Sequence, residues 1–314
     1  MPTAFVTGGS GFVGGALIER LVREGWEVRA LARSERAAER VRSLGAEPVM
    51  GDLDDLRIEG CDVAFHAAAK VEDWGDPEEF EHVNVRGTQN VVDACRTGGV
   101  RRLVHVGTEA ALMAGQPLLN VDENAPLRPD SPALYSSSKA KAEQIVRAAD
   151  LETVVVRPRF VWGRGDTTLL PAITEMVTSG RFRWIGGGRQ LTATAHIDNT
   201  VEGLWLAATK APAGGVYFVT DGEPVVFRDF ITEWVGTQGV TIPDKSVPPR
   251  VASVAAAASE RIWRLLKRPG PPPLTRFTVW VSSQECTIDI SRAERELGYS
   301  PVTSREEGLA ELRS

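Results

Sequence analysis

The stretch VTGGSGFVGG, residues 6–15, places glycines at positions 8, 11 and 14, directly after a short apolar run and at the start of a helical pattern. Glycine permits a tight turn at the first position, close approach of a phosphate at the second, and close packing of helix on strand at the third. Such a turn holds a pyrophosphate against the free amides of a helix start, although a tight turn without a ligand is the alternative. We predict dinucleotide contacts from Gly8, Gly11, Phe12, Val13 and Gly14.

Outward from this turn, the first half of the chain alternates short β-type runs with longer helical patterns. Alternation of this kind, with β-rich central runs, indicates a parallel sheet covered by helices on both faces. Right-handed crossovers then give an α/β, doubly wound (Rossmann) fold. The expected strands are 3–7, 27–31, 47–50, 62–67, 102–106 and 153–157.

The alternation breaks after residue 158, where glycine-rich and proline-rich segments follow. A helical pattern at 194–210 and a β-type run at 214–222 nevertheless fit a last helix and strand of the first domain. We therefore expect a second, smaller domain that is discontinuous in sequence. The expected domains are a dinucleotide-binding domain of 1–163 plus about 194–221, and a C-terminal substrate-binding domain of about 164–193 plus 222–314.

Composition limits the function classes. A formal net charge of −6 argues against broad binding of nucleic acid. Cys61, Cys95 and Cys286 have no spacing typical of a metal site or a disulfide framework, so we predict reduced thiols and no metal. The N-terminus has no secretion signal and no apolar run approaches the roughly 20 residues that span a bilayer, so a cytoplasmic location is expected. The motif HIDN, 196–199, is interpreted as structural, with Asp198 capping a helix.

Four motifs follow one another in order: TGGSGFVG, HAAA, NVRGT and Tyr135-x-x-x-Lys139. Together they resemble the extended short-chain dehydrogenase/reductase family, which includes the NAD-dependent epimerases and dehydratases. The resemblance covers the whole chain, densely to about residue 163. HVGTEA and RPRFVWGRGD resemble its 3β-hydroxysteroid dehydrogenase/isomerase-like branch, and Phe160 stands where sugar-nucleotide epimerases have an asparagine.

The resemblance implies a catalytic group. Tyr135 would be the general acid/base, and Lys139, one helical turn away, would hold the nicotinamide ribose. Free tyrosine has a pKa near 10, and a neighbouring ammonium and a positive nicotinamide are expected to lower it. Thr108 falls where the family has the hydroxyl that orients the substrate oxygen, although Gly107 replaces a second hydroxyl there. Glu109 could approach the site, but it is expected to face solvent or to cap a turn. The alternative is a Tyr–Lys pair on a solvated helix face.

The resemblance also implies the cofactor site. NAD-specific members have an acidic residue near the end of the second strand, whereas this chain has Arg33, directly before a helix expected to begin at Ser34. A 2′-phosphate would satisfy that guanidinium, so we predict NADP, with NAD as the alternative cofactor and a solvated arginine as the alternative interpretation. The remaining predicted cofactor contacts are Asp52, Leu53, Ala67, Ala68, Ala69, Tyr135, Lys139, Pro158 and Val161.

We therefore expect an oxidoreductase that interconverts a secondary alcohol and a ketone on a bulky apolar substrate, steroid-like or β-keto acid-like. The alternatives are a sugar-nucleotide epimerase or dehydratase and a non-catalytic nucleotide-sensing regulator. Residues 251–268 have the composition of an interfacial helix, but a helix that packs Ile262 and Leu266 inward is the favoured interpretation over membrane contact. The sequence is compatible with a homodimer, and with either oxidation or reduction as the reaction direction. A flat apolar ligand could stack on Trp74, Trp162, Trp184 or Trp263, although scattered tryptophans usually belong to the core.

Overall fold

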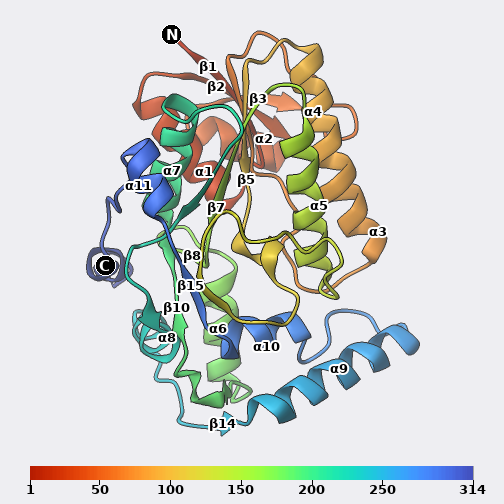
Figure 1. Cartoon of the computed structure of the whole chain (residues 1–314), viewed down its shortest axis with the longest axis vertical. Coiled ribbons are helices and arrows are strands. Elements are labelled where there is room, and N and C mark those ends of the chain that lie inside the picture. Colours follow the sequence, from red (N-terminus) through yellow and green to blue (C-terminus); the bar gives the residue numbers. More distant parts are fainter. Residues whose placement is uncertain (314) are drawn as a thin grey trace.

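The computed structural model describes residues 1–313 and contains a seven-stranded sheet in its upper half as drawn in Figure 1. All the pairings within this sheet are parallel. The doubly wound parallel fold predicted from the sequence is therefore confirmed. The strand order is β12 (Gly215–Val219), β7 (Glu152–Pro158), β5 (Arg102–Val106), β4 (Val63–His66), β1 (Thr3–Thr7), β2 (Glu27–Ala32) and β3 (Glu47–Met50).

Alternate residues of these strands pack against opposite helix layers. Val6 joins a core with α1 (Phe12–Arg23) and α7 (Ile197–Thr209), whereas Phe5 joins a core with α4 (Gly87–Thr97) and α5 (Leu134–Ala148). Because both sheet faces are covered, these strands read as nearly continuous apolar runs in the sequence. α2 (Glu35–Ser43) packs on β2 and β3 at the edge of the sheet.

A second sheet of four short strands lies below the first in Figure 1. Its order is β13 (Val225–Val226), β10 (Leu191–Thr192), β15 (Cys286–Ile288) and β6 (Leu118–Val121). β6 comes from a stretch for which the sequence predicts no strand. The helices of this half are α6 (Leu169–Thr178), α8 (Phe227–Gly236), α9 (Pro249–Leu265) and α10 (Arg276–Ser283).

Two of the tryptophans suggested as ligand platforms belong to the core of this lower half. Trp162 and Trp184 are 0% and 1% exposed and pack with Phe230 and Trp234 of α8. Their rings meet aromatic neighbours edge to face, as Trp162 does with Phe230 at 5.1 Å between centroids. These two tryptophans therefore belong to the core, which is the usual place of scattered tryptophans, and not to a ligand platform.

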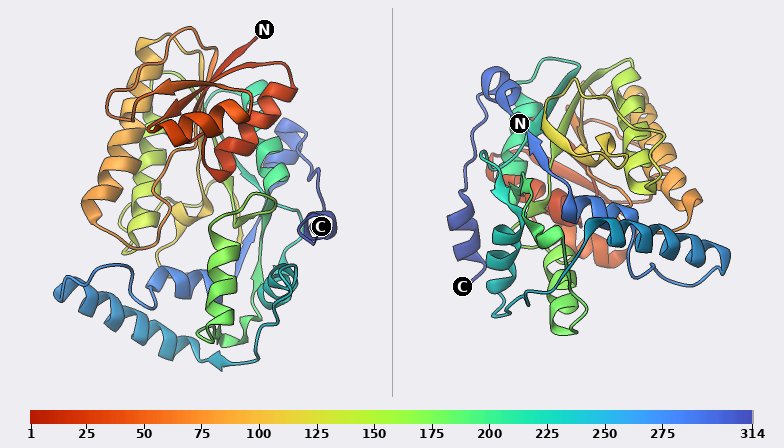
Figure 2. Two further views of the ribbon diagram at one scale, coloured as in Figure 1. Left: turned by 180° about the vertical axis from the view of Figure 1, so that it is seen from behind. Right: turned by 60° about the horizontal axis from the view of Figure 1, so that its bottom comes forward.

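α9 runs along the end of the molecule farthest from the seven-stranded sheet and projects to one side (Figures 1 and 2). Ala252 and Ala256 face inward, and buried Glu260 accepts hydrogen bonds from the amide and Nε of Arg276, both at 2.7 Å. Ile262 and Leu266 are 46% and 56% exposed, so the interpretation that they pack inward was wrong. Small side chains make the contact with α10 instead. No helix within residues 1–313 is both long and apolar enough to cross a membrane.

Candidate active site

The predicted site residues gather at the carboxyl edge of the seven-stranded sheet. Gly8 follows β1, Ala67 follows β4, Thr108 comes two residues after β5, and Pro158 ends β7. Hydrogen bonds tie these strand ends together, since the Ala67 amide donates to Thr7 O at 3.2 Å and the Gly107 amide to Val156 O at 2.7 Å. This edge is where open parallel sheets bind their ligands.

The glycine turn has the backbone that the sequence predicts. Gly8 has φ +73°, and a Cβ there would lie 2.7 Å from the carbonyl carbon of Ala67. A Cβ at Gly14 would lie 2.2 Å from Gly8 O, so only glycine lets α1 pack this closely on the turn. Gly11 is the N-terminal cap of α1, and the amides of Phe12 and Val13 open that helix. The turn therefore fits a dinucleotide phosphate at its helix start.

The three predicted catalytic side chains come together from two elements. Thr108 lies two residues after β5, and its hydroxyl lies beside that of Tyr135 at the start of α5. Lys139 lies one turn along α5, is 4% exposed, and donates to Val106 O at 2.8 Å. The partly exposed Tyr135 ring meets Phe277 of α10 edge to face at 5.6 Å, so the lower half of the molecule contributes to the site. The alternative, a solvated Tyr–Lys pair, does not match this burial.

Burial has the largest effect on the pKa values of both Tyr135 and Lys139. Burial, and then the negative charge of Glu109, raise the pKa of Tyr135 well above its usual value, although the hydrogen bond with Thr108 opposes them. Burial lowers the pKa of Lys139 to about 8, against the opposing charge of Glu143. The predicted lowering of the Tyr135 pKa rests on the ammonium together with a bound nicotinamide, so it stays a prediction for the complex with cofactor. A positively charged nicotinamide would act in the opposite direction.

The pH dependence of cofactor binding should follow Lys139. Because its pKa is about 8, the ammonium is present below that pH and is lost above it. NADPH affinity, measured by fluorescence titration, should be constant from about pH 6 to 7.5 and weaken by up to about tenfold per pH unit above about pH 8. Lys139→Met should bind more weakly at neutral pH with no such dependence. The same alkaline weakening in Lys139→Met would show that another group titrates.

Sequence reasoning missed a buried ion pair beside Thr108. Glu109 is 3% exposed, and its Oε1 lies 2.5 Å from Nη1 of Arg159, which is 2% exposed. The other carboxylate oxygen accepts the Thr108 hydroxyl at 2.8 Å. The expectation that Glu109 faces solvent was wrong, because Arg159 at the end of β7 needs a buried partner. Thr108 does cap the turn at Glu109–Leu112, accepting the amide of Ala110 at 3.1 Å.

The predicted adenosine contacts lie farther along the same edge. Arg33 is exposed after β2 and makes no ion pair within residues 1–313, and the following Ser34 caps α2. Asp52 Oδ1 accepts the amides of Asp54 and Asp55 at 2.9 and 3.3 Å, so part of this carboxylate holds a local turn. The other predicted contacts are partly exposed along this edge, apart from buried Pro158: Leu53 after β3, Ala67, Ala68 and Ala69 after β4, and Val161 at the start of β8 (Val161–Trp162).

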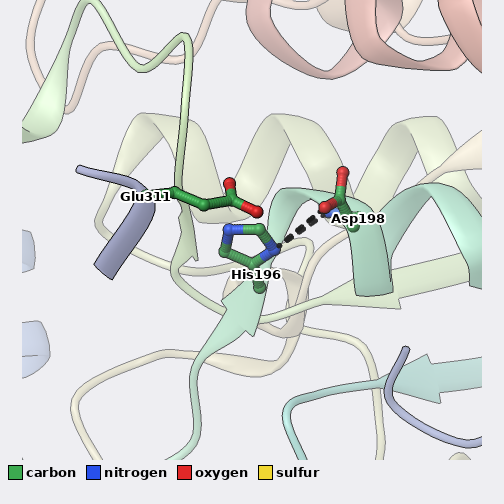
Figure 3. A group of neighbouring side chains, drawn as sticks. All are labelled: His196, Asp198 and Glu311. Carbon is green, nitrogen blue, oxygen red and sulfur yellow. Dashed lines mark hydrogen bonds and ion pairs between the residues drawn. The ribbon is translucent and has the colours of Figure 1, made fainter. Parts of the chain in front are cut away.

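Figure 3 draws a separate group of three side chains, in which His196, Asp198 and Glu311 bring potential metal ligands within 4.8 Å of one another. The Nδ1 atom of His196 already accepts the Asp198 amide at 3.3 Å, so His196 caps α7. A Cβ at Gly163 would lie 2.6 Å from Nε2, which leaves that side of the ring closely packed. The expectation that Asp198 is the cap was wrong, since it lies in the first turn of α7.

A profile of the 3-beta hydroxysteroid dehydrogenase/isomerase family matches residues 5–248. The chain belongs to this family. It is 45% identical to a 4-hydroxy-2-methyl-3-oxo-4-farnesyl-3,4-dihydroquinoline-1-oxide ketoreductase of Stigmatella aurantiaca, over 98% of this chain and 95% of that protein. It is 38% identical to a 2-alkyl-3-oxoalkanoate reductase of Stenotrophomonas maltophilia, over 98% of both chains. The predicted family and its branch are thereby confirmed.

Among solved structures the chain resembles MoeE5 in complex with UDP-glucose and NAD, with a TM-score of 0.75 and 22% identity over 99% of this chain and 97% of that one. At this identity the likeness concerns the fold alone. Membership of the 3-beta hydroxysteroid dehydrogenase/isomerase family makes the protein an NAD(P)-dependent oxidoreductase.

Proposed function

We propose that this protein reduces the ketone of a bulky apolar molecule to a secondary alcohol, with NADPH as the preferred cofactor. The observation that carries the proposal is the convergence of Thr108, Tyr135 and Lys139 at the carboxyl edge of the sheet. The two ketoreductase and oxoalkanoate reductase relatives support the choice of a ketone.

The side chains would share the work as follows. A bound nicotinamide supplies the hydride. Tyr135 holds a proton on its hydroxyl and donates it to the carbonyl oxygen as that oxygen gains charge. Thr108 fixes the position of the reacting oxygens, and Lys139 holds the ribose. Gly8, Gly11 and Gly14 leave room for the phosphates, the residues after β3 and β4 leave room for the adenosine, and Arg33 would take the 2′-phosphate.

Phe160, two residues after β7, weighs against a sugar nucleotide as the substrate. Its ring packs edge to face with the buried rings of Phe227, Phe230 and Trp234 at 5.7 to 6.3 Å between centroids. An asparagine at this position would offer hydrogen bonds to a sugar nucleotide, whereas phenylalanine offers none. Epimerisation or dehydration of sugar nucleotides is therefore the less supported reading, and an intact Tyr135–Lys139 pair argues against a non-catalytic regulator.

The test is turnover by the purified protein with NADPH and NADH against three substrate sets: sterol ketones, long-chain β-keto acids and sugar nucleotides. We expect NADPH oxidation with a ketone from the first two sets. Turnover of a sugar nucleotide alone would favour the epimerase reading, and no turnover of any kind would favour the regulator.

Arg33→Ala should weaken NADPH much more than NADH, because only NADPH carries a 2′-phosphate. A charge-assisted hydrogen bond is worth about 1.5–3 kcal/mol, so the dissociation constant of NADPH should rise by about 10- to 150-fold. Isothermal titration with both cofactors measures the two effects. Equal weakening would show that Arg33 does not read the 2′ position, and a wild-type preference for NADH would contradict the NADP assignment.

A further inference from the structure

Four buried polar side chains form one chain of contacts from the catalytic hydroxyls to the smaller sheet. Thr108 Oγ1 donates to Glu109 Oε2 at 2.8 Å, and Arg159 Nη1 donates to Glu109 Oε1 at 2.5 Å. Arg159 Nη2 reaches Thr192 Oγ1 at 3.3 Å, in strand β10. All four side chains are at most 8% exposed. Water therefore offers them little competition, and the geometry of each depends on its protein partners.

The proton of the Thr108 hydroxyl is taken up in this arrangement. A threonine hydroxyl has one proton and two acceptor positions. The proton goes to Glu109, and the oxygen accepts the Ala110 amide at 3.1 Å and faces the Tyr135 hydroxyl. Glu109 therefore sets the direction of the Thr108 proton and leaves the oxygen turned toward Tyr135.

Arg159 in turn sets the direction of Glu109. A buried guanidinium needs an oxygen acceptor. Here Arg159 binds one of the two carboxylate oxygens of Glu109. The other oxygen is left for Thr108. A glutamine at 109 could not serve both, because its single oxygen would turn to Arg159 and its amide group would face Thr108.

We infer that Glu109, oriented by Arg159, is a positioning residue that holds the Thr108 hydroxyl in place for the reaction. The inference rests on the proposed function, in which Thr108 fixes the reacting oxygens. Glu109 acts through Thr108 and touches no substrate atom in this role. Its loss should therefore lower kcat and leave the KM for NADPH unchanged.

The test compares two double variants from which the buried charge pair has been removed. In Glu109→Gln/Arg159→Met the glutamine oxygen is free to accept the Thr108 proton, whereas Glu109→Leu/Arg159→Met offers no acceptor. Neither leaves a buried charge unpaired, so their folding is comparable. We expect kcat to be about 3- to 10-fold lower in the leucine variant, the equivalent of one neutral hydrogen bond. Equal kcat values would overturn the inference.

The same two double variants are then made in a protein that also carries Thr108→Val. If Glu109 acts through the Thr108 hydroxyl, the difference between glutamine and leucine should disappear there. A difference that persists would show that residue 109 acts in another way, through packing or direct contact with substrate.

The matched control is a second buried ion pair, between Arg157 of β7 and Glu143 of α5. Glu143 and Arg157 are both 0% exposed, with 2.9 Å between Glu143 Oε2 and Arg157 Nε, and neither contacts Thr108. The pair Glu143→Gln/Arg157→Met and Glu143→Leu/Arg157→Met should show a kcat ratio that Thr108→Val does not change. If Thr108→Val changed the kcat ratio of the glutamine and leucine variants equally at positions 109 and 143, the effect would come from a general loss of packing. That result would overturn the inference.

Two further measurements keep the test decisive. A crystal structure of the wild-type protein should place Thr108 Oγ1 within about 3.2 Å of Glu109, and a separation beyond hydrogen-bond reach would overturn the inference even if every variant unfolds. Failure of the proposed function has a different signature, since the wild-type protein would then turn over no ketone. If the wild-type protein reduces a ketone but the variants do not show the expected kcat differences, only the role of Glu109 is contradicted.

Discussion

Tyr135→Phe should abolish most ketone reduction and leave NADPH binding intact. Phenylalanine keeps the ring and its edge-to-face contact with Phe277 at 5.6 Å, and removes only the hydroxyl that lies beside Thr108. A positioned proton donor contributes about 10²- to 10⁴-fold to rate, so kcat should fall by that factor. Steady-state turnover with the best ketone, beside fluorescence titration of NADPH, measures both effects.

A control separates the lost proton from a disturbed helix. Ser137 lies two residues along α5 on another face, where its hydroxyl donates to Pro129 O at 2.6 Å. Ser137→Ala removes a hydroxyl from the same helix without touching the site, and kcat should change by less than about twofold. Retention of more than about a tenth of wild-type turnover in Tyr135→Phe would remove this tyrosine from the mechanism.

The large sheet was predictable because its signal is local. The expected strand at 3–7 matches β1 to the residue, and the expected strand at 102–106 matches β5. A strand buried on both faces needs a continuous apolar run, and the glycines of the first turn are required by contacts of 2.2 and 2.7 Å that no side chain would permit. Both requirements fix the residue types at these positions, so they can be recognised in the sequence.

The second sheet was not predictable in the same way. β6 pairs with β15, which lies more than 160 residues later, and Leu119 of β6 is 59% exposed. Asn120 in the same strand has φ +45°, so the stretch has neither the alternation nor the backbone of a regular strand. Its pairing is decided by the lower half of the chain, which a local pattern does not contain.

The role of Glu109 was missed for a related reason, although one signal was available. The strand TVVVRPR is apolar except for Arg157 and Arg159, and two buried arginines require two buried acids. Since β5 and β7 are parallel neighbours, an acid just after β5 was a candidate partner for an arginine just after β7. The turn itself is present, but Thr108 and not Glu109 caps it, and a local preference for a turn says nothing about which way the carboxylate points.

Gly14→Ala should damage cofactor binding more than its single methyl group suggests. The added Cβ would lie 2.2 Å from Gly8 O and 2.7 Å from the carbonyl carbon, and both are backbone atoms that cannot rotate away. α1 and the glycine turn would have to separate, and overpacking of this kind costs about 1–3 kcal/mol of folding stability.

The affinity for NADPH should fall further, because the separation moves the amides at the start of α1 away from the phosphates. One lost charge-assisted hydrogen bond corresponds to about a 10- to 150-fold rise in the dissociation constant. Thermal unfolding and isothermal titration with NADPH on the same sample measure both quantities.

Gly236 provides the matched control for this prediction. It ends α8, and a Cβ there would meet no atom within 4 Å. Gly236→Ala should therefore leave NADPH binding unchanged and alter stability by no more than about 1 kcal/mol, in the stabilising direction. If Gly14→Ala bound NADPH as tightly as Gly236→Ala, the turn between β1 and α1 would not be the phosphate site. The cofactor would then have to bind elsewhere along the edge of the sheet.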